Sequence, residues 1–474
     1  MGFPDLPFRS VNPVTGEIVE AVPFHEQQEI EVRLERASQA FRTWRKFSVA
    51  DRGKLLEAVA QCLEEEADRL ADLACREMGK LRVAARAEVE KCAWLCRFFG
   101  KQASDWLASD WIPRERDVVE VRFEPVGTIL SITPWNFPYW QIFRAVVPAL
   151  AAGNTVLVKP SELVPATALA TEETFSKSGF PSGVVQLLLV PRSSVSRLIQ
   201  DRRIHGVSLT GSERAGREVA AVAGAALKPL VLELGGSDPF LVFPSADINQ
   251  ALSCAVQARI QNNGQSCIAA KRFLLHESIA EEFEKGLVSA FQQLRIGDPR
   301  DPVTELGPLV NGEAAERLEL QVQKSVAAGA ELLLGGCRRP EGSAYFLPTI
   351  LRNPPPGSPA FDEELFGPVA TLFRFRTVQE AVELANAPGF GLGAAVWTQK
   401  EAEAEEVARE LRGGTVVVNG MVASDPRIPF GGSGRSGFGK ELGREGLLEW
   451  THIKAIAGVS GPARRAVPGQ LESR

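Results

Sequence analysis

Several residue types that mark particular classes of protein are scarce in this chain. Its 474 residues include four histidines and seven cysteines, and no two cysteines are spaced as C-x-x-C. A disulfide framework or a structural zinc site is therefore not expected, because both use closely spaced, paired cysteines. No run of the sequence approaches the roughly 20 apolar residues that a membrane-spanning helix needs. We expect neither a metal centre nor a membrane anchor.

The balance of charge excludes a second group of functions. The chain has 59 acidic and 53 basic residues, for a net charge of −6. A global basic surface for nucleic acid or anionic lipid is therefore absent. The first residues, MGFPDLPFRS, lack the basic and apolar regions of a signal peptide. We predict a cytoplasmic globular protein, and its length predicts two or three domains.

The first hundred residues have the periodicity of helices. Apolar residues from Ile30 to Trp44 recur at spacings of three and four, which predicts one helix with a buried stripe. Asp51 is placed to cap a second helix that carries leucines from Leu55 to Leu73. A third helix follows, with Cys92 and Cys96 on its apolar face, where the thiols act as small hydrophobic groups.

From residue 117 onward the pattern changes to short β-branched runs. An alternating run at 117–123 and a buried one at 127–132 come first, and further runs lie at 155–158, 183–189, 206–210 and 230–234. Segments of helical length separate most of these runs, which predicts parallel crossovers and an α/β fold. A second series extends from about residue 240 to 419, and residues 451–457 read as a short strand outside both series.

Two glycine-rich segments bear on nucleotide binding. Residues 432–437 (GSGRSG) match G-x-G-x-x-G, but too little chain follows them to complete a nucleotide-binding fold. A glycine-rich loop near an active cleft is the better interpretation. The turn at Gly211 and Ser212 joins a strand to a helix, and its backbone N–H groups are suited to a phosphate. Ordinary packing explains such a turn equally well, so both interpretations stay open.

Three side chains are candidates for chemistry. Cys267 lies among small and amide residues, and a following helix would lower its pKa, whereas the alternative is a structural cysteine. Glu233 ends an apolar strand, where a carboxylate is costly unless it faces a cleft. Asn136 stands in a stretch bounded by two prolines, which suits a rigid oxyanion donor or simply a stiff loop.

Taken together and in order, seven segments resemble the NAD(P)-dependent aldehyde dehydrogenase superfamily over essentially the whole chain. They are 134–138 (PWNFP), 159–162 (KPSE), 209–212 (LTGS), 232–236 (LELGG), 263–267 (NGQSC), 363–368 (EELFGP) and 429–432 (PFGG). The resemblance implies an aldehyde dehydrogenase-like α/β fold with a discontinuous Rossmann-like cofactor domain and an α/β catalytic domain. It also implies a small β arm and tail for oligomerisation, in a homodimer or homotetramer. The implied boundaries are 1–117 and 134–233 for the cofactor domain, 234–450 for the catalytic domain, and 118–133 and 451–474 for the arm and tail.

The resemblance also implies a mechanism. Cys267 is the nucleophile that attacks the aldehyde, while the Asn136 amide and the Cys267 backbone N–H hold the oxyanion. Hydride transfer to the nicotinamide leaves a thioester, and Glu233 activates the water that hydrolyses it. An acylating enzyme that passes the thioester to coenzyme A is disfavoured by Glu233.

Implied cofactor contacts involve nine residues. Lys159, Ser161 and Glu162 lie at the adenine ribose, Gly211 and Ser212 at the pyrophosphate, and Glu364 at the nicotinamide ribose. Phe366 lies beside the nicotinamide, and Thr133 and Trp135 line the same cleft. Because the Glu162 carboxylate would repel a 2′-phosphate, we expect NAD to be preferred with some use of NADP.

The most similar branch is the succinate-semialdehyde dehydrogenases. Arg144 and Ser424 occupy the positions where that group binds the distal carboxylate of its substrate. A second arginine that many members carry five residues before the nucleophile is Asn262 here. We therefore predict oxidation of succinate semialdehyde to succinate through a single arginine. The alternatives are a broad aliphatic or aromatic aldehyde dehydrogenase and a catalytically silent relative with a structural or binding role.

Overall fold

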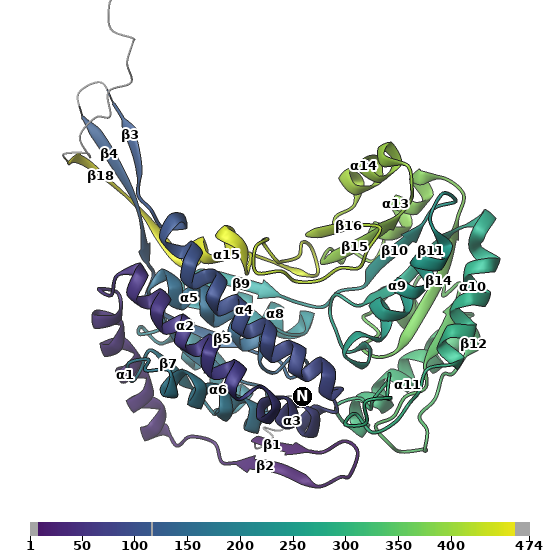
Figure 1. Cartoon of the computed structure of the whole chain (residues 1–474), viewed down its shortest axis with the longest axis horizontal. Coiled ribbons are helices and arrows are strands. Elements are labelled where there is room, and N and C mark those ends of the chain that lie inside the picture. The colour runs from purple at the N-terminus through teal and green to yellow at the C-terminus, as the bar shows by residue number, and fades with distance from the viewer. Residues whose placement is uncertain (1–7, 115–116, 460–474) are drawn as a thin grey trace, which may run out of the picture.

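Two large, mainly parallel β-sheets form the frame of the molecule, and each lies in its own body (Figure 1). The computed structural model describes residues 8–114 and 117–459, so the predictions for residues 1–7 and 460–474 fall outside the described residues. One sheet has six strands in the order β17-β9-β8-β5-β6-β7, and the other has seven in the order β12-β13-β14-β11-β10-β15-β16. These sheets confirm the expected α/β class.

The six-stranded sheet is covered by helices on both faces. Its strands are β5 (Thr128–Ile132), β6 (Thr155–Lys159), β7 (Val185–Leu187), β8 (Gly206–Thr210), β9 (Leu230–Glu233) and β17 (Gly437–Phe438). Successive residues of a strand pack on opposite faces of this sheet. In β5, Ile129 packs in the hydrophobic cluster that contains α5, and Leu130 packs in the cluster that contains α1 and α8. The covering helices are α1 (Gln27–Trp44), α5 (Trp140–Ala152), α6 (Pro165–Lys177), α7 (Val195–Gln200) and α8 (Glu213–Ala225), with the short 3₁₀ helix η1 (Arg192–Ser194) between β7 and α7.

The amino-terminal helices differ from the sequence prediction in two details. The expected second helix is two helices, α2 (Val49–Glu65) and α3 (Ala67–Met78), and α4 (Arg82–Trp106) follows them. The residue that caps α2 is Ser48, whose hydroxyl accepts a hydrogen bond from the backbone N–H of Asp51 at 3.1 Å. Asp51 therefore lies in the first turn, where a carboxylate also favours a helix amino terminus. An antiparallel hairpin of β1 (Phe8–Val11) and β2 (Ile18–Val22) precedes these helices.

The seven-stranded sheet forms the second body. Its strands are β10 (Asp238–Val242), β11 (Ala270–His276), β12 (Glu331–Leu334), β13 (Thr349–Arg352), β14 (Val369–Phe375), β15 (Gly393–Trp397) and β16 (Thr415–Val418). The edge strand β12 alone pairs antiparallel within it. The helices of this body are α9 (Ile248–Ile260), η2 (Gln261–Gly264), α10 (Glu277–Gln292), α11 (Gly312–Ala327), α12 (Pro359–Asp362), α13 (Val378–Asn386) and α14 (Glu401–Glu410).

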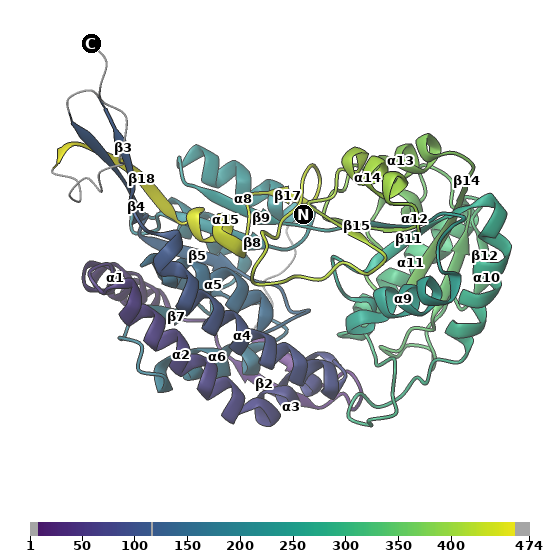
Figure 2. The same cartoon turned by 45° about the horizontal axis from the view of Figure 1, so that its top comes forward.

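A three-stranded antiparallel sheet projects from the first body as an arm (Figures 1 and 2). It contains β3 (Asp110–Pro113), β4 (Val118–Pro125) and β18 (Thr451–Val459), in the order β18-β4-β3, and α15 (Gly443–Leu448) leads into it. The predicted range for the arm, residues 118–133, is therefore wrong at both ends: it begins after the first strand of the arm and extends into the six-stranded sheet. Residues 128–132 form β5 of the six-stranded sheet, because they are buried on both sides, and β3 adds residues 110–113 to the arm. Pairing of this arm with a second copy stays a prediction.

The fold brings the expected site residues to the side of the first sheet that faces the second body. The parallel strands β5, β6, β8 and β9 end at Ile132, Lys159, Thr210 and Glu233. The segments that follow these ends carry most of the expected cofactor residues. Ligands bind at this edge of open α/β sheets. Among the described residues no helix is long and apolar enough to cross a membrane.

One buried carboxylate fixes the helix that follows this edge. Glu77 of α3 is 1% exposed, and its carboxylate accepts hydrogen bonds from the backbone N–H groups of Ala166 at 2.7 Å and Thr167 at 2.9 Å. These groups belong to the first turn of α6, which has no side-chain cap of its own. Glu77 therefore satisfies donors that would otherwise be buried without partners.

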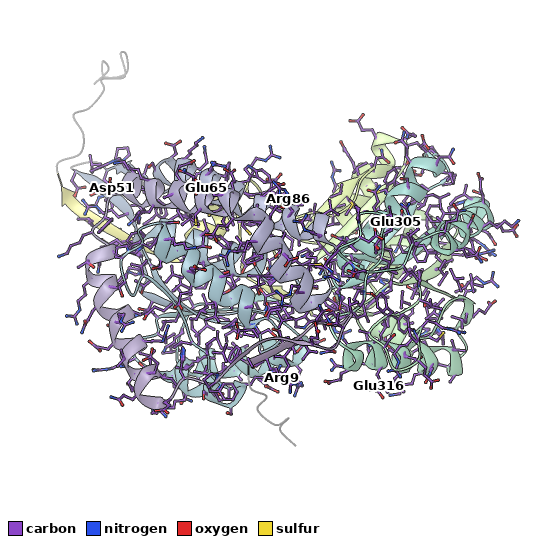
Figure 3. The ribbon with its side chains drawn as sticks, turned by 60° about the horizontal axis from the view of Figure 1, so that its bottom comes forward. Arg9, Asp51, Glu65, Arg86, Glu305 and Glu316 are labelled. Carbon is purple, nitrogen blue, oxygen red and sulfur yellow. The ribbon has the colours of Figure 1, made fainter. Side chains whose placement is uncertain are left out.

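We expect Glu77→Ala to destabilise the protein by about 1–3 kcal/mol, the usual cost of leaving buried donors unsatisfied. Thermal denaturation followed by circular dichroism measures this as a lower unfolding midpoint. Glu316→Ala is the matched control, because Glu316 is an exposed residue of α11 at the surface of the molecule (Figure 3). Equal midpoints for the two variants would contradict the capping role.

Candidate active site

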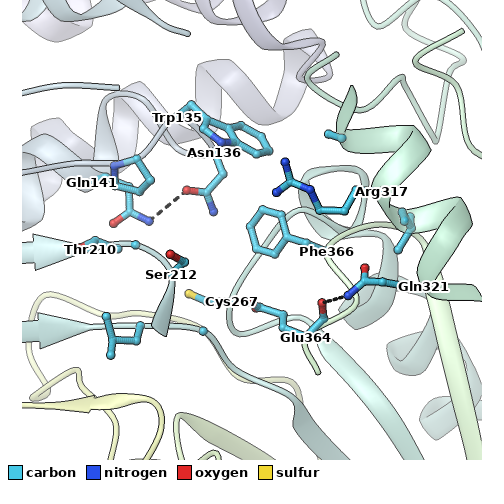
Figure 4. Close-up of a pocket in the computed structure, with 16 residues that line it drawn as sticks. Trp135, Asn136, Gln141, Thr210, Ser212, Cys267, Arg317, Gln321, Glu364 and Phe366 are labelled. Carbon is cyan, nitrogen blue, oxygen red and sulfur yellow. Dashed lines mark hydrogen bonds between the residues drawn. The ribbon is translucent and has the colours of Figure 1, made fainter. Parts of the chain in front are cut away.

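A cavity of about 340 Å³ lies between the two bodies and gathers seven of the expected site residues. Those seven are Trp135, Asn136, Gly211, Ser212, Cys267, Glu364 and Phe366 (Figure 4). They come from the ends of β5 and β8, from the loop before β11 and from the loop before β14. The rings of Trp135 and Phe366 meet edge to face, with centroids 5.7 Å apart, and form an apolar wall. The rest of the lining includes polar groups suited to a dinucleotide.

Helix α11 supplies a wall of this cavity that the sequence did not indicate. Arg317 and Gln321 line it, and the Gln321 side-chain amide donates to the backbone oxygen of Glu364 at 3.4 Å (Figure 4). The two residues are one helical turn apart, so they project from the same face. No motif marks them, because their role depends on how α11 packs against the first body.

A second cavity, of about 290 Å³, lies on the other side of Cys267. The two expected substrate residues, Arg144 and Ser424, both line it. Lys91 of α4 lines it as well, and the sequence analysis missed this residue. Cys267 borders both cavities, so its thiol lies where a substrate in one would meet a cofactor in the other.

The loop that carries Cys267 is held by hydrogen bonds to its backbone. Asn262 and Asn263 adopt left-handed conformations with φ of 55° and 58°, which asparagine tolerates better than most residues. The Asn262 amide donates to the backbone oxygens of Asn136 at 2.6 Å and Gln265 at 3.0 Å. Asn262 thus supports the expected oxyanion residue, Asn136.

Lys271 holds the same loop from the other side. Its buried ammonium donates to the backbone oxygens of Ser266 and Cys267, both at 2.8 Å, and lies 3.3 Å from the Glu364 carboxylate. The Glu364 carboxylate also accepts from the backbone N–H of Gly236 at 3.2 Å. A Cβ on Gly236 would lie 2.5 Å from the Cys267 oxygen, which explains glycine at this position. These contacts link the nucleophile to the expected nicotinamide-ribose residue.

The Asn136 side chain is oriented by a relay from Arg144. The Arg144 guanidinium donates to the Gln141 amide oxygen at 2.8 Å. The Gln141 amide in turn donates to the Asn136 side-chain oxygen at 3.4 Å (Figure 4). The Asn136 amide nitrogen must then point the other way, where one of its hydrogens binds the Gln265 backbone oxygen at 3.0 Å. Its second hydrogen is available for an oxyanion.

The thiol of Cys267 is not activated in this state. Burial raises the pKa of Cys267 to about 12, although Arg144 and Lys271 oppose the shift. The expectation that a following helix lowers this pKa is wrong, because a turn and then strand β11 follow Cys267. The resting thiol is therefore protonated at neutral pH.

Glu233 lines neither cavity and is 1% exposed. Neither carboxyl oxygen has a hydrogen-bond partner, and burial, together with the nearby Glu441, raises the pKa of Glu233 well above its usual value. Arg144 opposes that shift, but its guanidinium already forms a buried ion pair with Glu441. Glu233 is therefore a neutral acid in this conformation, one residue away from the cavity wall at Leu234.

Four expected cofactor residues lie outside both cavities. Lys159, Ser161 and Glu162 are clustered after β6, and Thr133 is joined to them because its backbone N–H donates to the Lys159 oxygen at 3.0 Å. The Glu162 carboxylate pairs with the Lys159 ammonium at 2.5 Å and with the Arg192 guanidinium at 3.0 Å. Two cations therefore balance the single negative charge of Glu162.

Across residues 8–114 and 117–459 no group of three or more His, Cys, Asp or Glu side chains is arranged to hold a metal ion. The site thus consists of a thiol, an amide donor, buried carboxyl groups and a cavity whose largely apolar wall also carries polar side chains. The loop of residues 432–437 lies beside β9, since Gly437 pairs with Glu233, which agrees with its interpretation as a loop near the cleft.

Comparison with known proteins agrees with this geometry. The sequence profile described as "Aldehyde dehydrogenase family" matches residues 5–456. A Synechocystis protein named probable succinate-semialdehyde dehydrogenase [NADP(+)] is 45% identical over 447 residues, 94% of this chain and 98% of that one. Succinate-semialdehyde dehydrogenase [NADP(+)] 1 of Mycobacterium tuberculosis is 42% identical over 456 residues, covering 95% and 99% of the two chains.

The solved structures support the same relationship. The crystal structure of succinic semialdehyde dehydrogenase from Streptococcus pyogenes, in complex with NADP+, superposes with a TM-score of 0.92 at 32% identity, over 94% of this chain and 99% of that one. The chain therefore belongs to the aldehyde dehydrogenase family. It is an NAD(P)-dependent oxidoreductase that converts an aldehyde to a carboxylic acid.

The high pKa of the Cys267 thiol predicts how it reacts in the free enzyme. The rate of alkylation by iodoacetamide should rise about tenfold per pH unit from pH 7 to pH 10, because only the thiolate reacts. Mass spectrometry of the peptide that contains Cys267 measures this rate, and Cys337, which is half-buried and distant in sequence, serves as an internal reference. A plateau below pH 8 would show that the free enzyme already holds a thiolate.

Proposed function

We propose that this enzyme oxidises succinate semialdehyde to succinate with NADP or NAD, using Cys267 as its nucleophile. The observation that carries the proposal is the position of Cys267 between a cavity suited to a dinucleotide and a second cavity lined by cationic side chains. The names of its relatives favour the same substrate. The expected cytoplasmic location and the expected oligomer stay predictions.

The cofactor residues present in this chain fit a nicotinamide dinucleotide. Ser212 lines the cavity as the N-cap residue of α8, so the positive amino-terminal end of this helix lies where it can attract a pyrophosphate. Glu364 is fixed by Lys271 and Gly236 where it can accept hydrogen bonds from a ribose. When bound, the nicotinamide accepts a hydride from the substrate carbon.

Side chains of the protein carry out the attack on the aldehyde and the hydrolysis of the thioester. The Cys267 thiol releases its proton to solvent, the thiolate attacks the aldehyde carbon, and the free hydrogen of the Asn136 amide binds the resulting oxyanion. After hydride loss the carbon is held as a thioester on Cys267. The Glu233 side chain turns from its buried position toward Leu234 and the cavity, where it loses its own proton to solvent, and its carboxylate then takes a proton from the attacking water.

Glu233→Gln should separate the two halves of this reaction. Glutamine matches the neutral acid that the buried position holds, so the fold is retained. We expect a burst of reduced cofactor followed by turnover slowed about 10²–10⁴-fold, the usual contribution of a general base. Stopped-flow absorbance measures both phases. Loss of the burst itself would assign Glu233 to thiol activation.

Cys267→Ala is the companion variant. It should show neither burst nor turnover while it binds the cofactor about as tightly as the unaltered enzyme, because it lacks only the covalent step. Turnover in Cys267→Ala would refute the proposed nucleophile.

We propose that the enzyme prefers NADP to NAD. The sequence prediction of an NAD preference weighted repulsion by Glu162 above attraction by Lys159 and Ser161, but Lys159 and Arg192 both pair with the Glu162 carboxylate. A 2′-phosphate could exchange with that carboxylate for the same cations. The named NADP(+) specificity of the relatives supports this weighting.

The test is a panel of succinate semialdehyde and butanal against both cofactors. We expect kcat/KM to be at least about tenfold higher for succinate semialdehyde, the scale of one charge-assisted hydrogen bond. Equal rates for the two aldehydes would favour a broad aldehyde dehydrogenase.

Glu162→Ser should raise the ratio of kcat/KM for NADP over that for NAD, since it releases two cations. A lower ratio in this variant would show that Glu162 itself supports NADP binding.

A further inference from the structure

The expected oxyanion residue, Asn136, lies just before a buried helix that has no cap of its own. Helix α5 begins at Trp140, every one of its residues is buried, and Tyr139 at its N-cap position provides no side-chain hydrogen bond. The first backbone N–H groups of a helix have no partner within the helix, and a buried donor without a partner is costly. The first donors of α5 therefore need acceptors from another element.

Glu88 of α4 supplies the acceptor. One oxygen of its carboxylate, Oε1, accepts hydrogen bonds from the backbone N–H groups of Tyr139 and Trp140, both at 2.9 Å. The next N–H group, of Gln141, donates to the Phe137 backbone oxygen at 2.9 Å. The helix dipole also favours a negative group at this end. Glu88 therefore attaches the start of α5 to α4.

Lys80 takes the other oxygen of the same carboxylate. Its ammonium forms a buried ion pair with Oε2 of Glu88 and lies 3.8 Å from the centre of the Phe137 ring. Phe137 directly follows Asn136 in the chain. Lys80 and Glu88 thus hold the segment of residues 137–140 through one aromatic ring and two backbone N–H groups.

The position of Asn136 depends on this segment in two ways. Its backbone leads directly into the segment, and Pro138 restricts the freedom of the connection. Its side-chain oxygen accepts a hydrogen bond from Gln141, which lies in the first turn of α5 and moves with that turn. A displacement of about 1 Å can slow a catalysed reaction about 100-fold. The start of α5 therefore sets where the Asn136 amide can meet an oxyanion.

We propose that Glu88 and Lys80 are a positioning pair that holds the Asn136 amide at the oxyanion site. The inference rests on the proposed function, in which Asn136 binds the oxyanion. Both side chains border the second cavity, but the charge of each is used within the pair and at the start of α5. Lys80 keeps the carboxylate in place, because a buried carboxylate without a cation is costly.

The experiment follows reduced cofactor in a single turnover by stopped-flow absorbance, because this step requires the oxyanion. In Glu88→Ala we expect its rate constant at saturating substrates to fall about 10- to 100-fold, the scale of a displaced oxyanion donor. An unchanged rate constant would overturn the proposal.

Glu77→Ala is the matched control, because it too removes a buried carboxylate that accepts from two N–H groups at the start of a helix. It should lower the thermal unfolding midpoint but keep the single-turnover rate constant. Equal losses of rate in Glu77→Ala and Glu88→Ala would make Glu88 a general structural residue and overturn the proposal.

A glutamine variant tests the same contacts without removing the side chain. The carboxylate offers Oε1 to α5 and Oε2 to Lys80, whereas a glutamine amide has a single acceptor oxygen. In Glu88→Gln we expect the rate constant to fall about 5- to 10-fold, the scale of one hydrogen bond. Adding Lys80→Met should restore most of the rate, since the amide oxygen is then free to accept from α5. A double variant as slow as Glu88→Gln would overturn the proposal.

A double-variant cycle shows whether Glu88 acts through Asn136. Asn136→Ala should itself slow the single turnover about 10²–10³-fold, the usual effect of removing an oxyanion donor. Adding Glu88→Ala should slow it less than about twofold further, because the group that Glu88 positions is already absent. Effects that multiply would leave Asn136 as the oxyanion donor and overturn the role of Glu88. An undiminished rate in Asn136→Ala would remove Asn136 from the proposed function, and this inference with it.

Discussion

The reactivity of the protein depends on the hydrogen bonds that hold the backbone around Cys267. Lys271 donates to the oxygens of Ser266 and Cys267, and Asn262 donates to those of Gln265 and Asn136. These bonds fix the proposed nucleophile, Cys267, and the proposed oxyanion donor, Asn136, relative to each other. Because Lys271 also contacts Glu364, the same network reaches the expected cofactor ribose residue. Pre-set donors of this kind need no reorganisation when charge develops.

Burial changes the pKa values of the titratable groups in the resting site. Desolvation raises the pKa values of both Cys267 and Glu233, so burial favours the neutral forms of the proposed nucleophile and the proposed base. The permanent charges nearby are paired, with Arg144 on Glu441 and Lys80 on Glu88.

Much of the fold was predictable because its periodicity is strong. The α/β class, the helix ending at Trp44 and the strands at 155–159 and 206–210 follow from local patterns of apolar residues. Two predictions failed because neighbouring residues or strands could form the same contact. Ser48 rather than Asp51 caps α2, and the run at 128–132 pairs with β6 and β8 rather than extending the arm. Both outcomes depend on neighbours that a short window of sequence does not include.

Seven ordered segments are enough to identify the family without a structure, and with it the candidate roles of Cys267, Glu233 and Asn136. Which charges are balanced became visible only in the packed molecule. Glu441 lies 297 positions beyond Arg144, and Ser424 lies 333 positions beyond Lys91, yet each pair is in contact. Charge compensation and desolvation act through space, at distances of a few ångströms. For that reason a motif can name an arginine as a ligand, while only the packed structure shows that this arginine is paired with a buried carboxylate.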